Sequence, residues 1–579
     1  MVVRPETAPP ARSQAQAGPV AADHSLTGLV AGRVVDATTG AGLSNVIVWL
    51  SSVPGRATTA PTAPFPPQRV LVDRDGAFVF NRLPAGTYFV RAEKRGYAEG
   101  ALGRREPSGV TSAVDLRDGE IRANLTVGLW KYAAIEGRIL DDVGEPAAGV
   151  TVIALRRRIV AGHGRWVRSR SNTTDDRGMF RVNTLEPGDY CVFVPASQSA
   201  FAGEIAGSPV THQATFYPVA SSPSSLNVIA LQAGQERTGV QMQLRVVRSV
   251  RVSGTLTTPD GPAASTAVRI MPAFADELAT DQFLSIEVAT GRSDESGTFT
   301  MTGVPPGEYL IQAEATRTPS PFEIRPMQQA FWAAQPISVG SSDVTNVAVT
   351  LRPGLRVSGR LEFAGGIAAP TAAQITRGWV WLLPATNGAL EGGRTLGRAA
   401  IDATGRFTTQ AVPGGKYVLR VDGVARWAMA SAWLGSRDVA DSPIDLTSGD
   451  VSEVVVQMTN RQTSLSGPVL DALGAPDGDA SVLIFPTDPA LWVDSSAQPR
   501  RLRAGRTDDA GAFVIEGAPP GEYFVVAIGA ATVGDWRDPR VLDRLARVAS
   551  RVTLADGERR AVSLKTVPRP AGATGGGDK

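Results

Sequence analysis

Apolar and polar residues alternate in short segments along most of the chain. In the segment "YCVFV", Tyr190, Val192 and Val194 fall on one face, and the segment "YFVVA" at 523–527 has the same pattern. A period of two residues predicts half-buried β-strands. Turns rich in Asp, Asn, Gly and Pro separate these segments, as expected for strands joined by tight connections. About seven such strands in every ~105 residues predict antiparallel β-sandwiches.

One segment of the sequence occurs five times with constant internal spacing. A Phe is followed ten positions later by a Tyr, and a Gly stands two residues before each of them. Successive motif tyrosines are 102, 119, 108 and 106 residues apart, so each copy marks a unit the size of a domain. The copies are "DRDGAFVFNRLPAGTYFV" (73–90), "DDRGMFRVNTLEPGDYCV" (175–192), "DESGTFTMTGVPPGEYLI" (294–311), "DATGRFTTQAVPGGKYVL" (402–419) and "DDAGAFVIEGAPPGEYFV" (508–525). Their aromatic pairs are Phe78 and Tyr88, Phe180 and Tyr190, Phe299 and Tyr309, Phe407 and Tyr417, and Phe513 and Tyr523.

The repeated motif has a physical explanation as a folding device. The Asp and Gly before each Phe predict a tight turn that needs positive φ at the Gly. The Phe enters the core, and the Gly before each Tyr completes a second turn. The Tyr can bury its ring while its hydroxyl reaches back to a backbone group, as in the tyrosine corner of Greek-key sandwiches. The ten aromatic residues are therefore assigned a structural role.

Two further signals keep step with the motif. A short strand containing a Gly precedes each copy, and an alternating segment with a central turn follows it. From that Gly to the motif Tyr is 56, 53, 55, 58 and 56 residues, and the glycines are Gly32, Gly137, Gly254, Gly359 and Gly467. The phase predicts five sandwich units at 28–130, 131–247, 248–354, 355–461 and 462–567, between disordered tails at 1–27 and 568–579.

The links between these units are very short, as in "GLWKYAA" and "RPGLRVSG". A semi-rigid rod, that is, an elongated array of units, is the expected consequence. Helical signals are few. The clearest is 539–550, where Val541, Leu542, Leu545 and Val548 line one side of an expected short helix inserted in the fifth unit.

The order Gly-strand, Asp-x-x-Gly-x-Phe and Pro-x-Gly-x-Tyr resembles the carboxypeptidase regulatory-like domain family, which has multi-copy bacterial members. This resemblance covers about residues 28–567 as five copies. It implies a transthyretin-like (prealbumin-like) or Ig-like β-sandwich, related to the starch-binding-like fold and to the B-type repeats of surface adhesins. It also implies non-catalytic modules, because the zinc domain of the carboxypeptidases that give the family its name is separate. Fold alone does not fix function.

Composition excludes several classes of protein. The net charge of +2 provides no global field for nucleic acid, so we expect no nucleic-acid partner. One cysteine allows no intrachain disulfide. No run of 18 or more apolar residues exists, so no transmembrane helix is expected. The first 25 residues lack an apolar signal segment but contain "AQA" at 15–17, and we hypothesise that the true start lies upstream and encodes an export signal.

The sequence contains no recognised catalytic or metal-binding motif. The three histidines, His24, His163 and His212, have no metal-ligand spacing. There is no nucleophile elbow and no phosphate-binding loop, so we expect no enzyme, no cofactor and no metal. The acidic pairs at the start of the motif suggest calcium ligands. An Asp that caps its own turn is the favoured interpretation, because the fourth copy keeps the turn with Asp402 alone.

Tryptophans on strands are the candidates for a ligand-binding surface. Trp379 and Trp381 are two residues apart and share a face, and we expect both in the core, as Trp49 is expected to be in the first unit. Trp427 and Trp433 fall in an insertion after the fourth motif. They are therefore the predicted ligand-binding residues, with a polysaccharide as the candidate ligand.

A basic segment and the single cysteine also attract functional hypotheses. "RRRIVAGHGRWVRSR" (156–170) carries six Arg beside Trp166, which suits a polyanion, although a solvated hairpin tip is favoured. Cys191 occupies a position that holds Phe, Leu, Val and Phe in the other copies. It is therefore expected to be a buried apolar residue and not a nucleophile.

These patterns predict the fold more sharply than the function. The leading hypothesis is a non-enzymatic extracytoplasmic protein that serves as spacer, scaffold or adhesion module at the bacterial cell envelope. It would be periplasmic, on the outer surface or secreted, and a monomer whose partner is a polysaccharide or another envelope protein. The alternatives are a carbohydrate-binding protein that uses loops or exposed Trp, and a cryptic hydrolase.

Overall fold

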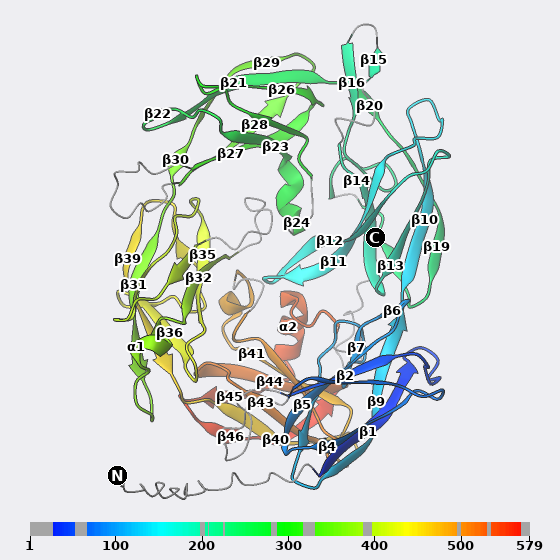
Figure 1. The fold of residues 1–579 in the computed structure, drawn as a ribbon, viewed down its shortest axis with the longest axis vertical. Helices are drawn as coiled ribbons and strands as arrows, with labels where there is room; N and C mark the ends of the chain where they lie inside the picture. Colours follow the sequence, from blue (N-terminus) through cyan, green and yellow to red (C-terminus); the bar gives the residue numbers. More distant parts are fainter. Residues whose placement is uncertain are drawn as a thin grey trace, which may run out of the picture.

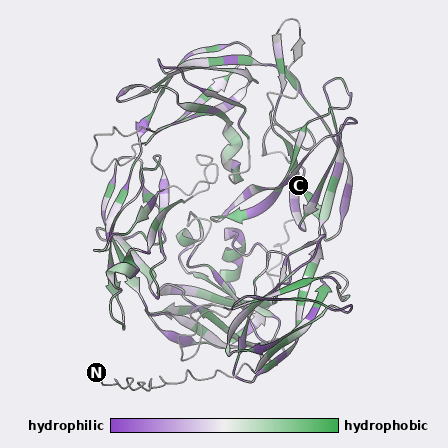
Figure 2. Ribbon diagram, viewed as in Figure 1, coloured by the Kyte–Doolittle hydropathy of each residue, from purple (hydrophilic) through white to green (hydrophobic). Residues whose placement is uncertain are grey.

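The computed structural model describes residues 27–52, 66–196, 203–205, 208–223, 226–279, 286–316, 330–385, 397–494, 499–529 and 534–568. The predicted tails and His24 lie outside these residues, apart from residues 27 and 568. Strands dominate, and the predicted all-β class is confirmed. Figure 2 shows apolar and polar residues mixed along the strands, as the alternation requires. Among the residues that the structure describes, no helix is long and apolar enough to cross a membrane.

Each of the first four units pairs a sheet that holds the first and last strands with a second sheet that holds the motif Tyr. In the first unit these are β4 (Ala77–Leu83), β1 (Gly28–Asp36), β9 (Ile121–Lys131) and β6 (Tyr97–Ala98), packed on β3 (Gln68–Leu71), β2 (Ile47–Ser52), β5 (Gly86–Glu93), β7 (Gly100–Ala101) and β8 (Ala113–Leu116). In the fifth unit the last strand also pairs with the strand of the motif Tyr, so the two groups of strands join in one sheet.

The second and third units repeat this plan and share a strand pair. The second has β13 (Met179–Leu185), β10 (Ala133–Leu140) and β19 (Glu236–Gln243), then β17 (Thr215–Phe216), β14 (Gly188–Val194), β11 (Thr151–Val160), β12 (His163–Thr173) and β18 (Ile229–Leu231), and a side sheet of β15 (Gly203–Ile205), β16 (Ser208–His212) and β20 (Val246–Arg248). The third has β22 (Gly261–Pro262), β21 (Val250–Thr258), β26 (Thr298–Val304) and β29 (Val344–Thr350), then β25 (Ala289–Arg292), β23 (Ala267–Pro272), β27 (Gly307–Thr316), β28 (Ala330–Val339) and β30 (Arg352–Pro353), with the 3₁₀ helix η2 (Ala273–Glu277). Strand β24 (Leu278–Ala279) of the third unit pairs with β12 of the second.

The described α-helices lie in the fourth and fifth units. The fourth has β34 (Arg406–Thr408), β31 (Val357–Ala364), β39 (Val451–Thr459), β36 (Ala428–Leu434) and β37 (Arg437–Asp438), then β33 (Arg398–Ala400), β32 (Trp379–Pro384), β35 (Lys416–Asp422) and β38 (Ile444–Asp445), with α1 (Ala372–Ile375). The fifth has β43 (Ala512–Glu516), β40 (Ser464–Leu470), β46 (Arg559–Ala561) and β47 (Leu564–Val567), then β42 (Arg503–Arg506), β41 (Ala480–Pro486), β44 (Gly521–Gly529) and β45 (Ser550–Leu554), with η4 (Pro489–Trp492) and α2 (Pro539–Ala546).

Helix α2 confirms the helical signal in the fifth unit. It begins after Asp538, whose carboxylate accepts a hydrogen bond from the Arg540 amide as an N-cap. Val541, Leu542 and Leu545 are buried, whereas Val548 lies beyond the helix and is 49% exposed. The helix is thus shorter than the pattern suggested.

The sandwiches are mainly antiparallel, as predicted, and each unit adds a parallel pairing between its first and last strands. Strand β1 runs parallel to β9 in the first unit, and β31 runs parallel to β39 in the fourth. The other units have the same pairing. Because first and last strands run in one direction, the chain leaves each unit at the end opposite to its entry, which suits a tandem array.

The units do not form the expected elongated rod. The chain curves, and the fifth unit lies against the first, second and fourth units (Figure 1). Arg105 of the first unit contacts Asp479 of the fifth at 2.6 Å, and His163 of the second contacts Asp494 of the fifth at 2.9 Å. Short linkers set how close successive units are, but these contacts between distant segments set the direction in which the chain turns.

Candidate binding cavity between the fourth and fifth units

The aromatic residues of the motif take the structural role that the sequence predicted. All ten are buried, and none is more than 8% exposed. Each Tyr hydroxyl donates a hydrogen bond to the carbonyl oxygen four residues upstream, which closes a tyrosine corner in every unit. The bonds are Tyr88 to Pro84 at 2.7 Å, Tyr190 to Glu186 at 2.7 Å, Tyr309 to Pro305 at 2.8 Å, Tyr417 to Pro413 at 2.9 Å and Tyr523 to Pro519 at 2.6 Å. Burial raises the pKa of Tyr88 to about 12, so this hydroxyl stays a donor.

The first Asp of each motif caps its own turn. In the fourth unit, Asp402 Oδ1 accepts hydrogen bonds from the backbone amides of Thr404 and Arg406 at 2.8 and 2.9 Å. The bond from the Thr404 hydroxyl, with those from the two amides, lowers the pKa of Asp402. The same pair of amide bonds occurs at Asp73, Asp175, Asp294 and Asp508. Among the described residues, no group of three or more His, Cys, Asp or Glu is placed to hold a metal.

The glycine of the opening strand has a role that sequence reasoning missed. A Cβ at Gly32 would lie 2.2 Å from the carbonyl oxygen of Leu125, where the register of β1 and β9 shifts. Gly32 also lies opposite the motif residue Phe78 in β4. A Cβ would also lie only 1.9–2.0 Å from a carbonyl oxygen at the equivalent glycines, each of which faces the motif Phe of its unit: Gly137, Gly254, Gly359 and Gly467. The nearly constant spacing from this glycine to the motif Tyr indicated that the position matters. The close approach of another strand, which explains why, cannot be deduced from one sequence.

Cys191 is fully buried, as the comparison of the five copies predicted. It lies opposite Leu155 of β11, in an apolar cluster that joins the second unit to Met271 and Leu278 of the third. Burial raises the pKa of its thiol, so the reactive thiolate is suppressed.

The basic segment forms the expected hairpin, but its tip is docked and not solvated. Strands β11 and β12 are joined at Ala161, which is 7% exposed and whose carbonyl accepts a bond from the Asp494 amide. Arg158 donates to Ser108 of the first unit at 2.7 Å. Arg156 contacts Glu186 within its own unit. The hairpin is therefore a contact between units, because its polar groups are paired across them. The remaining histidine, His212, is buried at 1% exposure.

The strand tryptophans are not in the core, which corrects the expectation for Trp49, Trp379 and Trp381. All three are half-buried, while the alternate residues Val380 and Leu382 fill the fourth core. The indoles lie on the outer face of the sheet and contact guanidinium groups there. Arg398 lies 3.2 Å from the Trp379 ring centroid and 5.0 Å from that of Trp381, and Arg69 lies 5.8 Å from that of Trp49.

A cavity of about 890 Å³ opens where this outer face meets the fifth unit. It lies within the volume range of small-ligand sites. Trp381 and the predicted Trp427 line it, and the ring of Trp427 is held edge-on by Phe363 at 5.1 Å between centroids. Trp433 does not line the cavity. It is 36% exposed on β36, with its indole nitrogen donating to Ser431 at 2.9 Å. The two tryptophans predicted together thus occupy different places.

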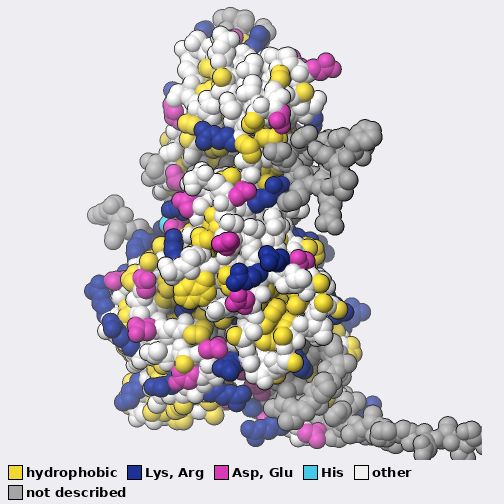
Figure 3. Space-filling view, turned by 90° about the vertical axis from the view of Figure 1, so that its left-hand side faces the viewer, with side chains coloured by type: hydrophobic (Ala, Val, Ile, Leu, Met, Phe, Trp, Pro, Cys, Tyr) yellow, Lys and Arg dark blue, Asp and Glu magenta, His cyan; other side chains and the backbone are white. Residues whose placement is uncertain are grey.

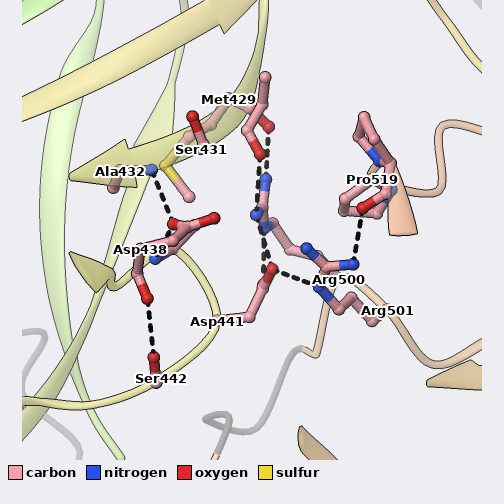
Figure 4. Close-up of polar contacts among 12 residues, drawn as sticks. Met429, Ser431, Ala432, Asp438, Asp441, Ser442, Arg500, Arg501 and Pro519 are labelled. Atoms are coloured by element: carbon pink, nitrogen blue, oxygen red, sulfur yellow. Dashed lines mark hydrogen bonds and ion pairs between the residues drawn. The ribbon is translucent and has the colours of Figure 1, made fainter. Parts of the chain in front are cut away.

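A buried ion-pair network fixes the wall of the cavity (Figure 4). Both oxygens of Asp441, in the fourth unit, accept hydrogen bonds from Arg500 of the fifth at 2.9 Å, and Oδ2 also accepts one from Arg501 at 2.7 Å. Arg500 donates to the carbonyl of Met429 as well. Burial raises the pKa of Asp441, but Arg500 and Arg501 outweigh this effect and hold it below its ordinary value.

The lining of the cavity is rich in positive charge. Its described lining residues include four arginines, Arg420, Arg500, Arg503 and Arg537, and one carboxylate, that of Asp422. Arg420 lies directly opposite Trp381 in β35, is 9% exposed and donates to the carbonyl of Ala440 at 2.8 Å. Burial lowers its pKa to about 10, with repulsion from Arg500 adding to the effect, so it stays charged at neutral pH.

The fold and this cavity define a class: a tandem array of β-sandwich units with a polar, aromatic-lined site at one junction. The sequence profile of the carboxypeptidase regulatory-like domain family matches residues 30–127. The first unit is thus a domain of this kind, and the other four units carry the same motif in the same fold. None of the curated protein sequences matches the chain.

Among solved structures, the chain is similar to pilins and adhesion repeats. The minor pilin GBS52 of Streptococcus agalactiae is 16% identical, with 38% of this chain and 96% of that chain covered and a TM-score of 0.22. The RrgB pilus protein of Streptococcus pneumoniae is 10% identical, with 76% and 98% covered and a TM-score of 0.16. Two B repeats of the Staphylococcus aureus collagen-binding protein are 10% identical, with 75% and 99% covered and a TM-score of 0.12.

Proposed function

We propose that this protein is a non-enzymatic, extracytoplasmic scaffold or adhesion module of the bacterial cell envelope. The observation that carries the proposal is the set of contacts that the fifth unit makes with the first, second and fourth units. Five sandwiches tied together in this way form one curved body that holds several surfaces in fixed relation. The repeated Tyr, Asp and Gly residues serve the fold, so we assign them no chemistry.

The outer surface suits a body of this kind. On the face formed by the fourth unit and its neighbours, basic, acidic and apolar side chains are interspersed (Figure 3). A mixed surface favours solubility and does not favour general attraction to polyanions. We therefore propose a monomer that carries specific contact sites for a polysaccharide or another envelope protein and has no nucleic-acid partner.

Small-angle X-ray scattering of the full chain tests the scaffold. We expect a maximum dimension much shorter than five sandwiches laid end to end. The double variant Asp479→Arg and Asp494→Arg places a like charge against Arg105, removes the carboxylate that His163 contacts, and should extend the particle. The control Glu362→Arg changes an exposed pair within the fourth unit and should leave it unchanged. A rod-like wild type would refute the proposal.

A further inference from the structure

The cavity between the fourth and fifth units combines groups that a pure scaffold does not require. We propose that it binds an acidic oligosaccharide of the uronic-acid class, with arginines on the carboxylates and indole rings on the sugar faces. This inference goes beyond the scaffold function and does not depend on it. Its support comes from the arginines, the carboxylates, the tryptophans and the shape of the site.

Two of the lining arginines have open donors. Arg503 donates through Nε to the carbonyl of Arg500 at 3.0 Å, and Arg537 contacts the ring of Trp536 at 5.5 Å. Within the described part of the chain, neither forms an ion pair with a carboxylate. Arg503 is half-buried, and desolvation lowers its pKa, so the surrounding protein disfavours its charge. A ligand carboxylate would offset that cost through two-point hydrogen bonds, which the planar guanidinium is shaped to give.

The nearby carboxylates leave this positive charge uncompensated. Asp441 already accepts hydrogen bonds from Arg500 and Arg501, so its negative charge is paired with these two and not with the other lining arginines. Asp422 is the one carboxylate among the described lining residues, and it is exposed. The cavity therefore favours an anion over a neutral ligand.

The tryptophans favour a ligand that has a flat apolar face. Trp381 lies between Arg398 and Arg420 in strand register, so its indole and these guanidinium groups share one sheet face. Trp427, the residue just before β36, lines the same cavity. A sugar ring offers an apolar face for the indole, and a uronic acid adds the carboxylate at the ring edge. Such a pairing of aromatic surface with a few fixed polar groups is typical of small-ligand sites.

The site can also admit a chain longer than one sugar. The exposed residues Asp422, Gly423, Ala428, Gly517 and Arg537 line it, so it opens to solvent. An oligosaccharide can therefore place one or two rings inside the cavity and extend outward.

Isothermal titration of the full-length protein with trigalacturonic acid tests the proposal. We expect binding that weakens as salt rises, because charge pairs contribute to it. The methyl-esterified trisaccharide keeps the rings and removes the charge, and should bind at least about 10-fold more weakly. Trp381→Ala and Arg503→Gln should each cost about 10-fold or more in affinity.

The first unit offers a matched control. Trp49 lies between Arg69 and Arg91 in the same register as Trp381 between its arginines, but does not line the cavity. Trp49→Ala should therefore leave affinity unchanged. The proposal is overturned if the methyl ester binds equally well, or if trigalacturonic acid does not bind at millimolar concentration. It is also overturned if Trp49→Ala loses binding while Trp381→Ala keeps it. Adenosine monophosphate is a flat anion that is not a uronic acid, and tighter binding of this ligand would likewise overturn the proposal. None of these outcomes depends on the scattering result that tests the scaffold.

Discussion

Asp441 and Arg500 form a two-point ion pair across the junction of the fourth and fifth units, with both hydrogen bonds at 2.9 Å. Their side chains are 8% and 14% exposed, so the pair is largely removed from water. Arg501 adds a second guanidinium to the same carboxylate. A buried pair of this kind contributes less to stability than its Coulomb energy suggests, but removing one partner leaves the other charge buried and unpaired.

Removal of the carboxylate should therefore loosen the junction. We expect Asp441→Ala to cost about 3–5 kcal/mol at the contact, because Arg500 and Arg501 remain buried without their anion. Hydrogen exchange of the amides in β36 and β42 measures this opening. Glu362→Ala, which breaks an exposed pair with Arg360 in the same unit, should cost less than about 1 kcal/mol. Equal effects of the two substitutions would contradict the assignment.

Acid should weaken the same junction. The folded-state pKa of Asp441 lies below the value of an unfolded Asp, about 3.9, so its stabilisation is complete above that value and is lost as pH falls through the folded pKa. The difference in Tm between wild type and Asp441→Asn should be constant from pH 7 to about pH 5 and shrink below about pH 4. Thermal melting followed by circular dichroism measures it. A difference that grows toward low pH would show that the carboxylate is not the group responsible.

Much of the fold was predictable because the motif repeats. The equal spacing of Phe407 and Tyr417 in the fourth unit and of their counterparts elsewhere identified the sandwich, and Cys191 could be placed in the core by comparison with its four sister positions. Local rules suffice where one strand's pattern determines which face is buried.

Contacts between units could not be predicted in this way. Trp381 was expected inside, because strand tryptophans usually pack inward, but Val380 and Leu382 occupy the core face and the indole takes the other. Arg500 and Arg503 follow no motif, and only the curvature of the chain brings them to Trp381. The candidate cavity therefore depends on the placement of whole units, which a single sequence does not encode in any local pattern.

The glycine of the opening strand makes a sharp test of the repeated architecture. In the fourth unit, a Cβ at Gly359 would lie 2.0 Å from the carbonyl oxygen of Val454, and backbone on a paired strand cannot move aside cheaply. Gly359→Ala should destabilise this unit by at least about 3 kcal/mol. Hydrogen exchange of β31 and β39 reports the loss. Gly366→Ala in the same unit, where nothing lies within 4 Å of the new methyl, should stay within about 0.5 kcal/mol. A tolerated Gly359→Ala would mean that β31 and β39 pair differently.

The hydrogen bond of the tyrosine corner should contribute measurably to the free energy of unfolding of each unit. In the second unit, the Tyr190 hydroxyl donates to the carbonyl of Glu186 at 2.7 Å, and the side chain is fully buried. Tyr190→Phe keeps the ring but leaves that carbonyl without its donor, and should cost about 1–2 kcal/mol. Native-state hydrogen exchange of β13 and β14 resolves this unit from the others, which a global melt of five units does not. Tyr217→Phe is the matched control, because Tyr217 packs against the same core and no hydrogen bond of its hydroxyl to a described residue is present. The control should change stability by less than about 0.5 kcal/mol, and equal costs would show that the corner bond contributes nothing beyond the ring.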